Sequence, residues 1–235
     1  MTDDGAAVTA VPTPLGPVRL AFAVGARDAP PPARVERLPG GADVATWRLD
    51  DGTSVRLRWG AVTPSVPAHL VPTGGCWGAV WSIRAGGGVD RLRISALLTE
   101  LPDGADGGPD SGEGLAAVTY TSDSVVLSVG TADEEDLHAR AGHPPDGPRG
   151  ASWLPPRWRD ELKPLWAGAA HVRLDRTGVV THLPSLAPGE AVHLHVAVAR
   201  SDRRRDDGDV APWFAVDTTP EHILAQLGAE TGDRS

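Results

Sequence analysis

Short segments in which apolar and polar side chains alternate, separated by turn residues, constrain the fold of this chain more than any other feature. Such alternation over about four to eight residues is typical of strands that bury one face. The turns draw on 28 glycines and 22 prolines among 235 residues, a share below the roughly 25–30% that marks low-complexity chains. We therefore predict ten strands, over residues 18–24, 43–49, 53–59, 77–84, 90–98, 116–121, 124–129, 169–174, 179–183 and 191–199.

This strand rhythm predicts an all-β fold. We expect a two-sheet antiparallel β-sandwich of about ten strands with two short helices. Hydrophobic residues make up 40% of the chain, enough for a sizeable core, and a sandwich of this length can form one domain. We assign that domain to residues 18–228, with residues 1–17 as a flexible N-terminal arm and residues 229–235 as a disordered tail.

The hairpin around Asp50, Asp51 and Gly52 shows how burial selects a strand register. A three-residue loop with Gly52 in the left-handed conformation pairs Trp47 with Val55, so the apolar side chains of both strands share one face. A two-residue turn mixes apolar and polar side chains on both faces. We therefore predict the three-residue loop.

Capping signals predict the two short helices. The first lies between Thr131 and Gly142 and begins with a capping box, in which a threonine and a glutamate three residues later satisfy each other's backbone donors. The second begins with Thr219 as its N-cap and Pro220 in its first turn, and it closes at Gly228.

Charge and composition exclude several classes of partner. The net charge of −9 argues against nucleic acid, because phosphate binding needs a clustered basic face. No stretch reaches the roughly 18 consecutive apolar residues of a membrane span, and the N-terminus lacks the charge pattern of a signal peptide. The single Cys76 cannot form an internal disulfide, in agreement with a reducing compartment. We therefore expect a cytoplasmic protein that binds neither nucleic acid nor membrane, and leave a homo-oligomer open.

Two further features of the composition, the scarcity of lysine and the absence of asparagine, indicate codon bias. Lys163 is the single lysine, and asparagine is absent. We interpret this as the signature of a GC-rich, actinobacterial genome, which carries no information about activity.

Four histidines form the first candidate site. His193 and His195 are two residues apart on a predicted strand, so both imidazoles face one side and can chelate Zn, Fe, Ni or Cu. Whether His171 and His182 join them depends on the hairpin between these two residues. A four-residue loop over residues 175–178 pairs them directly. A three-residue loop with a glycine bulge places His182 on the apolar face, and the turn sequence fits this second arrangement at least as well.

A divalent metal at these histidines is the one cofactor that the sequence leaves open. The alternative is that the imidazoles are solvated or hydrogen-bonded on the sheet. Apart from such a metal, we expect no cofactor.

The segment 152–166 is the second candidate site. Its tryptophans, prolines and acids can form a rim over a pocket, since tryptophan faces stack against sugar rings or flat apolar ligands. We name Trp153, Trp158, Trp166 and Asp160 as ligand-binding residues. The alternative is that these tryptophans pin an irregular crossover onto the sandwich, because eight of the eleven aromatic residues are tryptophan.

The stretch from Ser185 to Ala199, SLAPGEAVHLHVAVA, resembles a late strand of the supersandwich domains of bacterial carbohydrate-active enzymes. The match covers these residues firmly and the general strand rhythm loosely. The resemblance implies a β-sandwich with a short helix after its last strands.

Three hypotheses for function follow. The first is recognition of a small molecule, a carbohydrate or an apolar ring-containing metabolite, in a tryptophan-rimmed pocket. The second is an isomerase, cyclase or hydrolase that uses Glu161, His193 and His195 as acid, base or metal-binding groups. The third is a structural or partner-binding protein.

Overall fold

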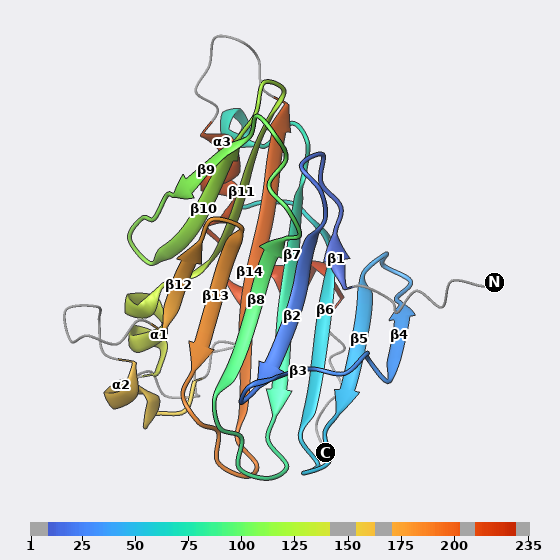
Figure 1. Ribbon diagram of the computed structural model, residues 1–235, viewed down its shortest axis with the longest axis vertical. Coiled ribbons are helices and arrows are strands. Elements are labelled where there is room, and N and C mark those ends of the chain that lie inside the picture. The colour runs from blue at the N-terminus through green and yellow to red at the C-terminus, as the bar shows by residue number, and fades with distance from the viewer. Residues whose placement is uncertain (1–8, 142–153, 163–170, 203–209, 229–235) are drawn as a thin grey trace.

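Two antiparallel sheets face each other in the computed structural model, which describes residues 9–141, 154–162, 171–202 and 210–228 (Figure 1). The smaller sheet has six strands in the order β1-β2-β8-β13-β12, with β3 beside β2. These strands are β1 (Ala10–Val11), β2 (Val18–Val24), β3 (Arg27–Asp28), β8 (Leu92–Leu98), β12 (Val172–Asp175) and β13 (Gly178–Leu183).

The larger sheet has eight strands in the order β4-β5-β6-β7-β14-β11-β10-β9. Its long central strands lie behind β2, β8 and β13 in Figure 1. The strands are β4 (Arg34–Arg37), β5 (Asp43–Arg48), β6 (Ser54–Val62), β7 (Cys76–Arg84), β9 (Asp106–Pro109), β10 (Leu115–Thr121), β11 (Val125–Ala132) and β14 (Ala191–Asp202).

The predicted all-β, two-sheet antiparallel sandwich is confirmed. All ten predicted strands are present, with ends that differ by no more than a few residues. The structure adds four strands that the alternation did not reveal, β1, β3, β4 and β9, each two to four residues long. Segments this short contain too few side chains for an alternation of apolar and polar residues to be recognised.

The core between the sheets is built around three aromatic side chains. Phe22 comes from the six-stranded sheet, and Trp47 and Trp81 come from the eight-stranded sheet. Their ring centroids lie 5.1 Å apart for Phe22 and Trp47, 5.6 Å for Phe22 and Trp81, and 5.7 Å for the two tryptophans. All three are buried, so these aromatic rings join the two sheets.

The hairpin between β5 and β6 has the predicted register. Trp47 pairs with Val55, and the backbone N–H of Leu49 donates to the carbonyl of Thr53 at 2.9 Å. Gly52 has a φ of 82°, the left-handed conformation that a three-residue loop requires. The register predicted from burial is therefore confirmed, and the Asp51 carboxylate supports the turn by accepting hydrogen bonds from the Thr53 backbone and hydroxyl.

Helices occupy the connections and the C-terminal region. They are η1 (Ala68–Leu70), α1 (Glu134–Ala141), α2 (Trp158–Glu161), α3 (Ala211–Val216) and α4 (Pro220–Gln226). α4 has the predicted cap, because the Thr219 side chain accepts a hydrogen bond from His222 N. α3 was not predicted from the sequence. None of these helices is long and apolar enough to cross a membrane.

α1 begins two residues later than the predicted capping box implies, and with a different cap. The Asp133 carboxylate accepts a hydrogen bond from Asp136 N at 2.9 Å. The Thr131 hydroxyl donates instead to the His195 carbonyl at 2.7 Å, and buried Glu134 accepts from the backbone N–H that begins β12, at 2.8 Å. The predicted capping box is therefore wrong, because both of its side chains bind neighbouring strands.

α3 and α4 cover the outer face of the eight-stranded sheet, and two glycines permit their close approach. A Cβ at Gly78 would stand 2.5 Å from Ile223 of α4, and one at Gly130 would stand 2.8 Å from Val216 of α3. A glycine inside a strand is typical of places where another element packs closely. The helices therefore rest almost on the sheet backbone.

The predicted flexible arm does not extend over residues 9–17. Ala10 and Val11 form β1, which pairs with β2, and Val11 and Leu15 are buried in the core. β1 is thus an edge strand of the six-stranded sheet, and the apolar side chains of this segment join the core despite the prolines around them. Residues 1–8 and 229–235 lie outside the described residues.

Candidate functional site

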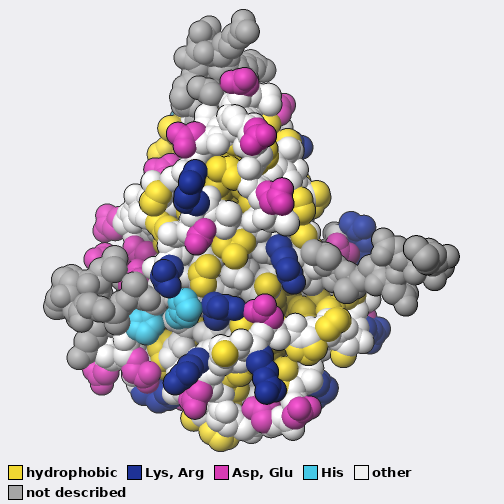
Figure 2. All heavy atoms as spheres, in the orientation of Figure 1, with side chains coloured by type: hydrophobic (Ala, Val, Ile, Leu, Met, Phe, Trp, Pro, Cys, Tyr) yellow, Lys and Arg dark blue, Asp and Glu magenta, His cyan; other side chains and the backbone are white. Residues whose placement is uncertain are grey.

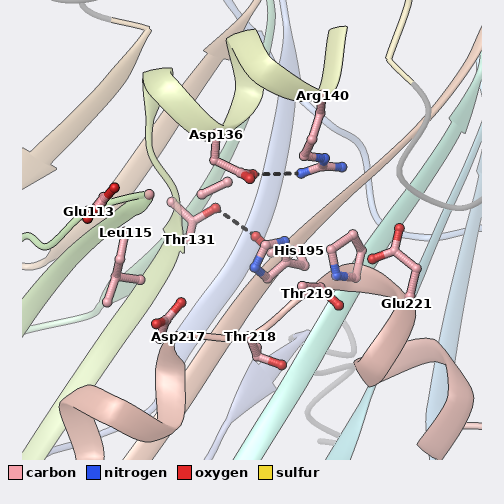
Figure 3. Close-up of a pocket in the computed structure, with 13 residues that line it drawn as sticks. Glu113, Leu115, Thr131, Asp136, Arg140, His195, Asp217, Thr218, Thr219 and Glu221 are labelled. Atoms are coloured by element: carbon pink, nitrogen blue, oxygen red, sulfur yellow. Dashed lines mark hydrogen bonds and ion pairs between the residues drawn. The ribbon is translucent and has the colours of Figure 1, made fainter. Parts of the chain in front are cut away.

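A pocket of about 330 Å³ lies on the outer face of the eight-stranded sheet, beside α1 and the connection from α3 to α4 (Figure 3). Its volume is at the lower end of the range typical of small-molecule sites. Residues from five stretches of the chain line it: Glu113, Gly114, Leu115, Thr131, Ala132, Asp136, Arg140, His195, Asp217, Thr218, Thr219, Pro220 and Glu221.

β14 provides the floor of the pocket through His195. The alternation of the strand directs Leu194 and Val196 into the core and His195 to the outer face. The Thr131 hydroxyl, at the end of β11, holds the His195 carbonyl at 2.7 Å. The imidazole lies between Thr131 and Thr218 in the middle of the pocket residues (Figure 3).

α1 forms one wall. Asp136 and Arg140 are one helical turn apart, and an Arg140 guanidinium nitrogen lies 3.4 Å from the Asp136 carboxylate. The same guanidinium donates to the His193 carbonyl at 3.1 Å. Arg140 therefore ties α1 to β14, and its charge is already matched by Asp136.

The opposite wall comes from the connection between α3 and α4. Asp217 follows the last residue of α3, and Glu221 lies in the first turn of α4. Glu113 enters from the connection that precedes β10. Together with Asp136, these side chains place four carboxylates from three stretches of the chain in the lining of one cavity (Figure 3).

Burial shapes the electrostatics of the pocket. The pKa of the His195 imidazole is about 3, because burial and, to a smaller extent, the charge of Arg140 lower it, while a hydrogen bond to the Thr218 backbone opposes the shift. Burial also raises the pKa of Asp136, an effect that Arg140 opposes and that the nearby charges of Asp133 and Glu221 increase. His195 is therefore neutral near pH 7.

Two buried polar atoms of the pocket lack a hydrogen-bond partner among the described residues. They are Nδ1 of His195 and Oε1 of Glu221. Buried polar atoms in folded proteins are nearly always hydrogen-bonded, so each exception calls for an explanation. Both side chains line the same cavity, although neither of these two atoms is itself exposed.

The hairpin that carries His171 and His182 pairs these residues directly, as expected for the loop over residues 175–178, and its turn is tighter than a three-residue loop. Asp175 pairs with Gly178, and Asp175 accepts hydrogen bonds from both the backbone and the hydroxyl of Thr177. His171 therefore stands opposite His182, with His171 Nδ1 3.0 Å from the His182 carbonyl oxygen. The three-residue loop, which the turn sequence fitted at least as well, is wrong because the aspartate stabilises the tighter turn.

The four histidines do not converge. His171 and His182 lie on the outer face of the six-stranded sheet, the face seen in Figure 2, where histidines (cyan) stand among arginines. His193 and His195 lie on the outer face of the other sheet, where Ser82 Oγ and His193 Nδ1 are 2.8 Å apart. The core separates the two pairs, so the predicted four-histidine metal site does not form. The described ranges contain no group of three or more histidine, cysteine or acidic side chains suited to a metal.

Trp158 belongs to the core and not to a pocket rim. It is fully buried, and its indole N–H donates to the Ser185 carbonyl at 2.8 Å. Its ring offers no face to a ligand, so the predicted stacking role does not fit this structure. Asp160 is exposed on α2 and does not line the pocket. Trp153 and Trp166 lie outside the described residues.

The predicted acid–base group is not assembled at one place. Glu161 lies on α2, where its carboxylate is 3.3 Å from Arg157. His193 lies beside the pocket under Arg140, and burial lowers its pKa. Of Glu161, His193 and His195, only His195 lines the pocket.

Sequence reasoning missed the acidic residues of this pocket. In the sequence, Asp136 is one of several acids in the first turn of α1, where the helix dipole favours negative charge, and no local pattern marks Glu113, Asp217 or Glu221 as site residues. The usable signal was indirect: Gly78 and the alanines of β14 mark the outer face of the sheet as covered, so a histidine on that face lies under packed helices.

Comparisons with known proteins concern the fold. No family model and no curated protein matches the chain. Among solved structures, a protein assigned as kojibiose phosphorylase, from the human microbiome, matches 90% of this chain with a TM-score of 0.50 and 6% identity. A polysaccharide lyase matches 80% with a TM-score of 0.36 and 15% identity. The chain spans 28% and 26% of the length of these proteins. The first likeness shows that this two-sheet sandwich also occurs as part of a larger protein.

Proposed function

We propose that this chain recognises a small, hydroxyl-rich molecule of the carbohydrate class in the pocket on the eight-stranded sheet. The observation that carries the proposal is that four carboxylates and neutral His195 line one cavity of about 330 Å³. Carboxylate oxygens accept hydrogen bonds from neighbouring hydroxyl groups, and charge-assisted bonds of this kind are about twice as strong as neutral ones.

The remaining lining suits the same ligand. Leu115, Ala132 and Pro220 contribute an apolar surface against which the carbon atoms of a sugar ring can pack. The fold adds modest support, since the solved structure with a TM-score of 0.50 is named for an enzyme of a sugar. The proposed pocket thus differs from the tryptophan rim expected from sequence, while the expected ligand class is kept.

Titration calorimetry with a panel of mono- and disaccharides tests the proposal. We expect at least one sugar to bind, and Asp217→Asn to weaken this binding at least tenfold, because a hydrogen bond to a charged group contributes about 1.5–3 kcal/mol. Asp217 is exposed at the end of α3, so its substitution leaves the fold intact.

Asp103→Asn is the matched control, because Asp103 is an exposed aspartate outside the pocket lining. This variant should bind like the unmodified protein. Asp160→Asn on α2 should also bind normally. Failure of every sugar to bind, or equal loss in the pocket and control variants, would overturn the proposal.

A further inference from the structure

The eight-stranded sheet ends at β4, which presents an open edge. β4 is the end strand of this sheet and stands beyond β5 at its right-hand side (Figure 1). Among the described residues, no strand pairs with the side of β4 that faces away from β5. The backbone groups of such an edge can hydrogen-bond to a further strand.

The other end strands of the two sheets carry features that oppose such pairing. The Glu134 carboxylate accepts the backbone N–H of Val172, at the start of β12. β9 ends with Pro109, and β1 is followed directly by Pro12. Proline lacks the N–H that a ladder of hydrogen bonds requires. β4 contains no proline, so only its charged side chains could keep another strand away.

The pairing of β4 with β5 determines which backbone groups of β4 point outward. The N–H of Leu38 donates to the Ala42 carbonyl at 2.7 Å, in the turn that joins the two strands. Residues with hydrogen bonds to the partner strand alternate with residues without them in an antiparallel ladder. Glu36 and Arg34, two and four positions before Leu38, therefore direct their backbone groups to β5. The N–H and C=O of Val35 point to the open edge.

A second copy of β4, antiparallel and centred on Val35, matches this edge. In that register the outward backbone groups of the two valines bond each other, and Arg34 of each copy stands opposite Glu36 of the other. Val35 is 42% exposed, and the side chains of Arg34 and Glu36 are 73% and 37% exposed. Opposite charges and apolar side chains at facing positions stabilise antiparallel strands.

The neighbouring registers do not match. When the pairing is centred on Arg34, Glu36 or Arg37, that residue faces its own copy, and like charges directly opposite each other destabilise a strand pair. Within one chain, Arg34 and Glu36 already lie 2.6 Å apart. The register centred on Val35 joins the ion pairs of both copies into one network. The charges of β4 thus oppose other strands and favour its own copy.

We infer that β4 is a docking edge for a second copy of this chain, which continues the eight-stranded sheet across a two-fold axis. The contact consists of one four-residue strand from each copy, and its area is far below the roughly 1,200 Å² at which stable interfaces begin. We therefore expect a weak dimer that forms at high protein concentration.

Sedimentation equilibrium at protein concentrations up to about 1 mM, in about 0.15 M salt, tests the inference. Arg34→Glu and Glu36→Arg should each weaken self-association about tenfold or more, because each places like charges opposite each other on both sides of the axis. An equimolar mixture of these two variants should associate as well as the unmodified protein, because opposite charges then face each other again.

Arg19→Glu is the matched control, since it makes the same change of charge at an exposed position of β2. This variant should associate like the unmodified protein. Val35→Pro should abolish the dimer and leave the fold intact, because proline is tolerated on an edge strand where the N–H points outward. An unmodified protein that stays monomeric, a dimer that persists in both charge variants, or a mixture that fails to associate would each overturn the inference.

Discussion

Arg157 and Glu190 form a bidentate ion pair between residues 33 positions apart in the sequence. The two contacts measure 3.2 Å and 2.6 Å. Glu190 also accepts from the backbone N–H of Ala187 at 2.7 Å, which closes the turn before β14. One carboxylate thus shapes the Pro-Gly-Glu turn and anchors the segment that contains α2.

We predict that Arg157→Lys lowers the free energy of unfolding by about 1 kcal/mol, because an ammonium cannot reproduce the planar two-point contact and the pair is partly exposed. Urea denaturation followed by tryptophan fluorescence measures the change. Arg34→Lys is the control, since the Arg34 side chain is 73% exposed in its pair with Glu36. Equal effects of the two substitutions would contradict the anchoring role.

Trp158→Phe should lower stability by about 1–3 kcal/mol, since it removes buried volume and the indole N–H that binds Ser185. The same variant should keep the affinity for any sugar that the unmodified protein binds. Denaturation and calorimetry on one preparation check both statements. A variant of full stability that has lost sugar binding would restore Trp158 as a ligand-binding residue.

The contact between Gly78 and Ile223 can be tested by a double-mutant cycle. Gly78→Ala alone should destabilise the protein by about 1–3 kcal/mol, because its Cβ would meet Ile223 at 2.5 Å. In the background Ile223→Ala, the added methyl group should cost much less, with a coupling of about 1 kcal/mol or more. Thermal denaturation provides the values. Additive effects would show that α4 does not rest on this glycine.

The neutral state of His195 predicts a specific pH dependence. Its pKa is about 3 in the folded protein and 6.5 is its ordinary value, so between these values the unfolded chain binds one proton more. The free energy of unfolding therefore falls as the pH falls through this interval, by at most about 1.4 kcal/mol per unit.

His195→Gln should remove this part of the pH dependence, since glutamine does not titrate and its amide can still donate to the Thr218 carbonyl. His69→Gln, at an exposed position on η1, should leave the slope unchanged. Stability measured at several pH values between 4 and 7 compares the two. Parallel slopes for His195→Gln and the unmodified protein would contradict a buried, neutral imidazole.

The sandwich was predictable because its long strands bury one face. Apolar and polar side chains therefore alternate along each of these strands, and this alternation can be recognised in the sequence. The hairpin at Gly52 shows the strength of this signal, since burial predicts its register and the hydrogen bonds from Thr53 to the Asp51 carboxylate support the same turn. The alternation does not predict β3, β4 and β9, because these strands have little or no apolar face. They are Arg27–Asp28, Arg34–Arg37 and Asp106–Pro109. The hairpin at Asp175 was undecided for another reason: a local aspartate–threonine turn determines it.

The candidate site was largely hidden from sequence reasoning. His195 was selected for its spacing from His193, whereas its place in the pocket depends on α3 and α4 packing over β14. Asp136 and Glu221 are 85 positions apart and meet through tertiary packing alone. No local pattern encodes such a meeting.

β14 has consequences for how a ligand enters. At 12 residues it is the longest strand of the described chain, with β7 and β11 hydrogen-bonded on its two edges. Strands covered in this way are the last to exchange their amide protons. The walls, in contrast, are one helical turn and two connections, which can open locally at lower free energy. The strand that shapes the pocket and the segments that control access to it are thus different parts of the chain. We expect substitutions that speed ligand release to lie in the wall segments and not in β14.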